Sequence, residues 1–225
     1  MDEIQKKGLN IATLYRWAKI DDPEKYKKIQ SDSLWNVLNE SLSCTNYDMA
    51  KVVQKMYEYE YKFTVSKNEK TWYEFKNHRW VSFNGNGINL QRRISEELPK
   101  QYLHISNYWK KKVLNSTPEN QKSNEAKKKS CEDALHKSKT TSFKDAVMKE
   151  CAMLFLDDEF REKKDSRLEL IGFENGVYDL KADLFRDGNP EDYCSFSTGI
   201  YYSDFDENDE TIDEVYEQQL QVVSE

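Results

Sequence analysis

The sequence of 225 residues contains only seven glycines, three histidines and four cysteines, and each shortage argues against a class of function. A phosphate-binding P-loop, GxxxxGK[ST], needs a glycine directly before a lysine, and none of the seven glycines precedes one. We therefore expect no nucleotide hydrolysis by these residues. The cysteines show no CxxC spacing and the histidines are scattered, so the sequence predicts reduced, mostly buried thiols and no metal site.

Long apolar runs are also missing. No run approaches the length of a membrane span, and the first residues, MDEIQKKG, do not form a signal peptide. Charged residues make up 33% of the chain and aromatic residues 13%, which is typical of a globular protein rather than a disordered one. These features predict an intracellular protein without a membrane partner.

The net charge of −7 is unevenly distributed along the chain. Residues 203–225 contain nine acids and no base, whereas residues 109–149 contain eleven lysines against five acids, a local charge of +6. Only the middle of the chain would therefore attract a polyanion. Lysine (27 residues) outnumbers arginine (7 residues), a usage that fits an AT-rich genome.

Hydrophobic spacing predicts helices in the N-terminal part of the chain. Residues 9–42 are expected to be helical, with a stop and restart at Pro23, which is placed at the first position of a helix. A further helix begins after Thr45 or Asn46 as its capping residue. Its apolar face consists of Met49, Val52, Val53, Met56 and Tyr57.

Two further regions also have helical spacing. One helix contains Pro99, which we expect to break or kink it. Residues 106–160 are predicted to be mostly helical, with one helix starting near Pro118 and another capped by Thr141 or Ser142.

Between these helical regions, residues 61–83 change to the alternating pattern of strands and predict a three-stranded antiparallel meander. Trp72 and Trp80 lie in this meander. Exposed tryptophans on a sheet can stack on bases. A small sheet, however, needs large apolar side chains on one face to form a core, so we expect both tryptophans to be buried.

Residues 168–202 predict a C-terminal β-hairpin region. Two short apolar runs flank Glu174, Asn175 and Gly176, and Asn-Gly readily supplies the positive φ angles of a tight turn. Asp187-Gly188 is a second turn candidate, and SFSTGIYY resembles a final strand. The predicted fold class is α+β, mostly helical with a small antiparallel meander and this hairpin region.

Lysine clusters provide the candidate binding residues. Tyr108 and Trp109 precede three lysines, and aromatic rings beside cations suit single-stranded DNA. A second lysine triplet in the lysine-rich stretch 122–139 lacks such aromatics, and that stretch is either a solvated helix or a mobile excursion. We expect weak, sequence-independent binding of single-stranded DNA by Trp109, Lys110, Lys111, Lys112, Lys127, Lys128 and Lys129, although a solvated helix face would explain the lysines equally.

Catalytic residues are not predicted. Asp204 and Asp206 form a DxD motif that could place two carboxylates on one strand face, as in a metal-dependent nuclease or primase. They lie in an acid-rich tail, where a solvated linker is the simpler interpretation. Asp157, Asp158 and Glu159 fit a helix-end loop.

Four segments carry a family resemblance in a fixed order. They are LYRWA with DPEKY in the N-terminal helices, YDMAKVV before the meander, TWYEF with HRW inside it, and LELIGFENGVYDLKADLFRDGNPEDYCSFSTGIYY at residues 168–202. Together, over about residues 9–202, they resemble the region that precedes the superfamily-3 helicase motor in poxvirus-type primase–helicases of large DNA viruses and their phage and plasmid relatives.

The resemblance implies a division into a helical module at residues 1–43, an α+β domain at 44–202 and an acidic linker or helix start at 203–225. It implies a non-catalytic collar ahead of a hexameric ring motor, supporting oligomerisation and DNA guidance in viral replication inside the host cell. ATP and Mg²⁺ would belong to that motor, which these residues do not contain, and the parent protein would be an ATP-dependent helicase and primase. The alternative is a stand-alone DNA-binding replication adaptor.

Overall fold

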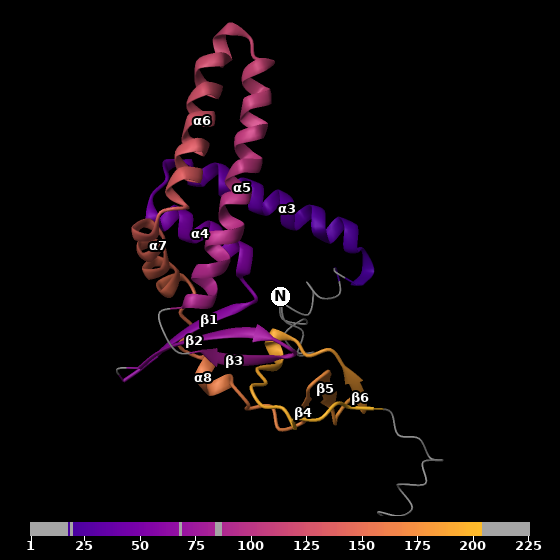
Figure 1. Cartoon of the computed structure of the whole chain (residues 1–225). Helices are drawn as coiled ribbons and strands as arrows, with labels where there is room; N and C mark the ends of the chain where they lie inside the picture. The colour runs from indigo at the N-terminus through magenta and orange to yellow at the C-terminus, as the bar shows by residue number, and fades with distance from the viewer. Residues whose placement is uncertain (1–17, 19, 68, 84–86, 204–225) are drawn as a thin grey trace, which may run out of the picture.

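The computed structural model describes residues 18, 20–67, 69–83 and 87–203. Helices form one end of the molecule and two small three-stranded antiparallel sheets form the other (Figure 1). This arrangement confirms the α+β fold class. Within the described residues, no helix is long and apolar enough to cross a membrane.

Helical residues at the start of the described chain end at Asp21, and two further helices follow. α3 (Pro23–Glu40) begins with Pro23 at its first position, as predicted, and the Asp22 carboxylate accepts from the backbone N–H of Lys25 (3.0 Å). A short 3-10 turn, η1 (Ser41–Ser43), leads to α4 (Asn46–Tyr57). The Thr45 side chain caps α4 by accepting from the Asp48 N–H (3.1 Å), which confirms the predicted start.

The predicted meander is present as β1 (Tyr61–Ser66), β2 (Glu69–Lys76) and β3 (Arg79–Phe83). Trp72 and Trp80 are both buried, which confirms their predicted place in the core. Successive strand residues face opposite sides, so Trp72 packs against the helices while Tyr73 and Trp80 pack on the other face. The sheet is therefore covered on both faces.

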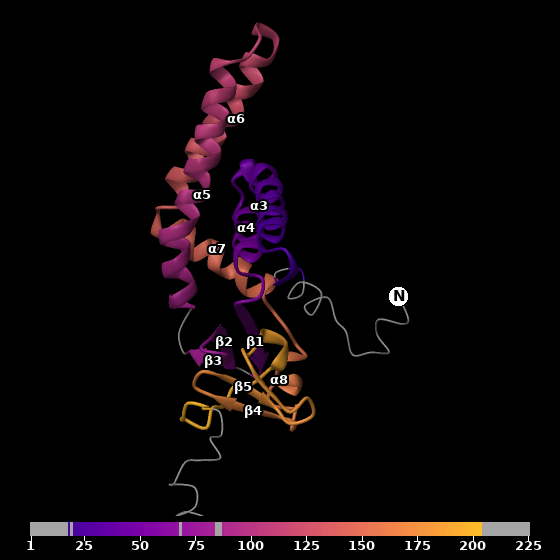
Figure 2. The same cartoon turned by 90° about the vertical axis from the view of Figure 1, so that its right-hand side faces the viewer.

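Three helices follow the meander. α5 (Ile88–Leu114) and α6 (Pro118–Lys137) form an antiparallel hairpin, and α7 (Thr141–Leu154) returns beside α4 (Figure 2). The lysine-rich stretch lies in α6, so it is a solvated helix and not an excursion. Thr140 is the N-cap residue of α7, one residue before the predicted position, and its side chain makes no capping hydrogen bond.

Pro99 does not break α5, contrary to one of the two predicted outcomes. A proline inside a helix removes one backbone hydrogen bond and crowds the preceding turn. The same helix buries an apolar stripe on both sides of Pro99, formed by Leu90, Ile94, Leu98, Tyr102 and Ile105. We attribute the continuity of α5 to that stripe, which packs into the main core with α4, α6 and α7.

The second sheet attaches beneath the first. It comprises β4 (Leu170–Phe173), β5 (Gly176–Asp179) and β6 (Leu184–Arg186), preceded by the short α8 (Phe160–Lys163) and followed by the 3-10 turn η2 (Pro190–Asp192). Phe160 and Tyr193 pack with Trp80 in a second apolar cluster. The Trp80 indole also donates to the Pro190 carbonyl (2.8 Å), which joins the two sheets.

The hairpin between β4 and β5 is present, but the predicted positive φ angles are wrong. Glu174, Asn175 and Gly176 all have negative φ. Asn175 instead bonds the Tyr202 backbone twice, with Nδ2 donating to the carbonyl (2.9 Å) and Oδ1 accepting from the N–H (2.8 Å). Gly176 is required for space, because a Cβ there would lie 2.5 Å from Phe185 Cζ.

Residues 195–202 do not form the predicted final strand. They run beside β4 with isolated backbone hydrogen bonds, such as the Thr198 N–H to the Gly172 carbonyl (2.8 Å). Gly188 packs against His78, and its N–H donates to His78 Nδ1 (3.2 Å). The expectations for Asp204, Asp206 and the rest of the acidic tail lie outside the described residues, and the proposed division at residues 43/44 stays a prediction.

Candidate nucleic-acid interface

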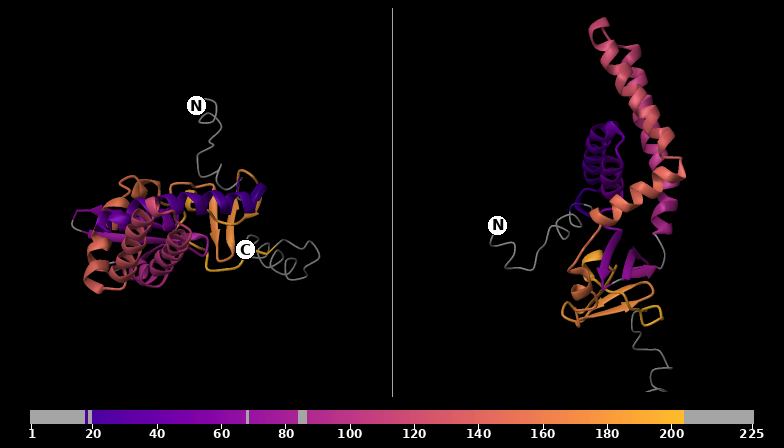
Figure 3. Two further views of the ribbon diagram at one scale, coloured as in Figure 1. Left: turned by 90° about the horizontal axis from the view of Figure 1, so that it is seen from above. Right: turned by 90° about the vertical axis from the view of Figure 1, so that its left-hand side faces the viewer.

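The α5–α6 hairpin extends beyond the rest of the molecule as a two-helix arm (Figures 1 and 3). We call residues 107–130 the basic arm. None of its side chains is buried. It contains seven lysines and two glutamates, giving a net charge of +5. Packing against the main core therefore does not account for the composition of this arm.

The arm brings together the two predicted lysine triplets, because one lies on each helix. Trp109 on α5 is half-buried near the base of the arm. Lys127 on α6 places its ammonium 4.4 Å from the Trp109 ring centroid, a cation–π contact. The Trp109 indole N–H donates to Asn39 Oδ1 on α3 (3.2 Å), so one ring face and the polar edge of Trp109 are already occupied.

Tyr108 is the more accessible aromatic side chain, with 37% of its surface exposed. Trp35 from α3 packs edge-on against it, with ring centroids 4.7 Å apart. Lys112 Nζ lies 5.5 Å from the Tyr108 ring centroid. The sequence analysis missed Trp35, because only the crossing of α3 and α5 brings it to this place.

The other predicted lysines differ in their surroundings. Lys110, Lys111 and Lys129 are exposed. Lys128 forms an ion pair with Glu132 one turn along α6 (3.3 Å), an exposed contact of about 0.3–0.5 kcal/mol. Lysines at the C-terminal end of α5 also face the negative end of the helix dipole.

Charge and accessible aromatic surface on one projecting element suit a polyanion with unstacked bases. Lysines on both helices can neutralise phosphates, while an exposed ring such as that of Tyr108 can stack on a base. Neither kind of contact selects a base sequence.

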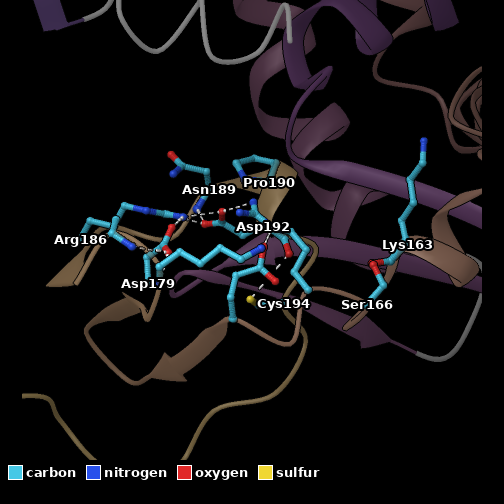
Figure 4. Close-up of polar contacts among 12 residues, drawn as sticks. Lys163, Ser166, Asp179, Arg186, Asn189, Pro190, Asp192 and Cys194 are labelled. Carbon is cyan, nitrogen blue, oxygen red and sulfur yellow. Dashed lines mark hydrogen bonds and ion pairs between the residues drawn. The ribbon is translucent and has the colours of Figure 1, made fainter. Parts of the chain in front are cut away.

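A second polar cluster surrounds the buried side chain of Asp192, close to β5 and β6 (Figure 4). Arg186 makes a bidentate pair with Asp192, at 2.6 and 2.8 Å, and Arg167 adds a third contact at 3.3 Å. The Asn189 N–H also donates to Asp192 (2.8 Å). The hydrogen bond to Asp192 raises the pKa of Arg186.

The Asp192 cluster therefore fixes η2 against β6, and its carboxylate oxygens are already engaged by protein donors. Among the described residues, no group of three or more His, Cys, Asp or Glu side chains could hold a metal ion. All four cysteines are buried free thiols, as predicted for most of them. Burial raises the pKa of Cys131 to about 12 and that of Cys194 to about 11, so these thiols are protonated near neutral pH.

Comparison with known proteins agrees with the resemblance read from the sequence. Residues 50–223 match the family model described as "D5 N terminal like". A protein of Acanthamoeba polyphaga mimivirus named "putative helicase" is 36% identical over 207 residues, covering 89% of this chain and 21% of that protein. A frog virus 3 (isolate Goorha) protein of the same name is 28% identical over 181 residues, covering 67% of this chain and 18% of that protein.

The chain thus spans about a fifth of the length of these relatives. A third protein of this name, from Invertebrate iridescent virus 6, is 47% identical over 45 residues, covering 20% of this chain and 5% of that protein. These matches confirm the predicted similarity to helicase-named proteins of large DNA viruses.

Proposed function

Because the chain belongs to the D5 N terminal like family, we propose that it is a non-catalytic collar region of a viral DNA primase–helicase. In this role it supports oligomerisation, with a hexamer in the parent protein, and guides single-stranded DNA. ATP and Mg²⁺ are used by a helicase motor outside these residues. The parent protein acts inside the host cell where viral DNA is replicated.

The observation that carries the DNA-guiding role is the basic arm. The arm lysines give this projecting pair of helices a local charge of +5 without a buried side chain, and such a surface attracts a polyanion. A nucleic-acid backbone that binds these lysines releases its condensed counterions, which favours binding at low salt.

Binding by one copy is expected to be weak. Three or four phosphate contacts contribute only a small binding free energy at physiological salt. In a ring of six copies the arms act together, and the effective concentration of the remaining arms raises the overall affinity. The acidic residues 203–225 compete with DNA for the arm.

The test compares the parent chain with the Lys110→Ala, Lys111→Ala, Lys112→Ala triple variant. Each lost phosphate contact reduces the slope of log affinity against log salt by about 0.7 for single strands. The triple variant should therefore lower the slope by about 2 and weaken binding to labelled oligothymidine at low salt. Deleting residues 203–225 should strengthen binding.

A matched control removes the same charge elsewhere. Lys25, Lys27 and Lys28 are exposed on α3, away from the basic arm, and their triple alanine variant should retain most of the salt slope. Equal losses in the two triple variants would mean that net charge alone governs binding. An unchanged affinity in the arm variant would mean that the lysines only solvate the helices.

The coding sequence after codon 225 distinguishes the collar region from the stand-alone adaptor. An open reading frame that continues past codon 225 to a GxxxxGK[ST] motif favours the collar of a larger enzyme. A stop codon at that point favours the adaptor.

A further inference from the structure

The lysines of the basic arm do not by themselves explain a preference for single strands. A duplex offers phosphates as well, and counterion release favours the binding of either form. A single strand offers in addition the faces of its unpaired bases, which can stack on aromatic side chains. Such side chains gather where α3 packs against α5, at the base of the basic arm (Figures 1 and 2).

Three exposed side chains follow one another along a single face of α5. They belong to His104, Tyr108 and Lys112, which are four residues apart and therefore lie one above the other at successive turns. Lys112 Nζ lies 5.5 Å from the Tyr108 ring centroid. Two rings are thus followed by a cation in the direction of the arm, and this order suits a strand whose bases stack and whose phosphates need neutralising.

Trp35 from α3 lies beside these α5 side chains. Its ring meets those of His104 and Tyr108 edge-on, with an interplanar angle of 82° in both pairs and centroid distances of 6.0 and 4.7 Å. Trp109 meets Tyr108 in the same way, at 83°. Among the described residues no ring is stacked in parallel on Tyr108, whose exposed 37% can therefore receive the face of a base.

Asn39 on α3 fixes the two tryptophans that flank Tyr108. Its Nδ2 donates to the Trp35 carbonyl (2.9 Å), and its Oδ1 accepts from the Trp109 indole N–H (3.2 Å). Both tryptophans also pack against the main core. The rings around Tyr108 are therefore held in place before any ligand binds, so little side-chain freedom is lost when a base stacks there.

We infer that an unpaired base of single-stranded DNA stacks on Tyr108 beside Trp35, while Lys112 neutralises an adjoining phosphate. The strand then runs along α5 from His104 toward the lysines of the basic arm. A base inside a duplex cannot make this contact, because the neighbouring base pairs cover both of its faces. Such a site rests on the proposed DNA-guiding function and adds to it a residue that distinguishes unpaired from paired strands.

The test compares the binding of oligothymidine with that of an abasic oligonucleotide of the same length, which has the same phosphates but no bases. The parent chain should bind oligothymidine about fivefold to 140-fold more tightly, equivalent to about 1–3 kcal/mol for one stacked base. Tyr108→Leu should lower this ratio to near one and leave the salt slope, which the lysines set, unchanged. Tyr108→Phe keeps the ring and should retain the ratio.

Tyr47→Leu is the matched control. Tyr47 on α4 is 49% exposed and has Lys51 Nζ 5.0 Å from its ring centroid, but it lies outside α5, so its loss should leave the ratio unchanged. Equal binding of the two oligonucleotides by the parent chain would overturn the inference without any variant, and so would a parent-like ratio in Tyr108→Leu. If the arm lysine variant still loses its salt slope, the lysine interface stands and only the stacking site is rejected.

Discussion

Replacing Asp192 by alanine should destabilise the protein strongly, because its carboxylate joins three elements. The side chain is 4% exposed and faces Arg186, which is 14% exposed. Removing one partner of a buried pair leaves the other charge without compensation and costs about 3–5 kcal/mol. At about 2–4 °C per kcal/mol for a protein of this size, the melting temperature should fall by roughly 6–20 °C.

Denaturant unfolding followed by tryptophan fluorescence measures this loss, since the Trp80 indole is bonded to Pro190 in the same turn as Asp192. Glu159→Ala is the matched control. Glu159 forms an ion pair with Lys163 but is 72% exposed, so its loss should cost less than about 1 kcal/mol. The double variant Arg186→Met, Asp192→Leu should lose less stability than Asp192→Ala, because no unpaired charge remains. An Asp192→Ala protein within about 1 kcal/mol of the parent would refute this reasoning.

Two other perturbations follow from the packing of the second sheet and from the buried thiols. Gly176→Ala should cost about 1–3 kcal/mol, because the added Cβ would lie 2.6 Å from the Arg186 carbonyl oxygen as well as against Phe185; a thermal melt equal to that of the parent would show that this contact relaxes freely. Cys131 should resist a thiol-reactive disulfide reagent at pH 8 until the protein unfolds, since burial raises its pKa from 9.0 to about 12. Rapid labelling of Cys131 in the native protein at pH 8 would contradict this expectation. The same pKa shift contributes stability that is fully present below pH 9 and is lost as the pH rises toward the folded-state pKa.

Local signals predicted the helices and the meander well. Thr45, Pro23 and Pro118 mark helix starts through the backbone chemistry of the first turn, which needs no distant partner. The alternation through residues 61–83 likewise fixed the meander, because a one-residue slip would move every side chain to the other face. Burial of both Trp72 and Tyr73 was harder to foresee, since it depends on a second cluster supplied by Phe160.

The errors arose where distant segments decide the local conformation. Asn175 suggested a positive-φ turn, but its side chain bonds the backbone of Tyr202, 27 residues later. Leu184–Arg186 forms β6 because it pairs with the edge of β5. Its own short sequence does not indicate a strand. Pro99 stays inside α5 because apolar contacts on both sides of it outweigh one missing hydrogen bond.

The sequence shows the lysines of the candidate interface but not their arrangement, and their binding of DNA stays a prediction. Both lysine triplets are visible in the sequence, yet their meeting on one arm requires the antiparallel packing of α5 and α6. Trp109 is predicted to offer a ring to DNA, which stays a prediction, and its observed contacts are structural. Asn39 holds its indole N–H and Lys127 covers one face, so this tryptophan ties the arm to α3.

That attachment determines how the arm can work. Below Trp109, the two helices share buried Tyr102, Ile105, Cys131 and Ala134 with the main core. Beyond Trp109, the basic arm has no buried side chain, and the packing of α5 against α6 is its main support. Segments with few buried contacts open at a lower free energy than the core. The lysines therefore project from a fixed base on the part of the hairpin with the fewest buried contacts.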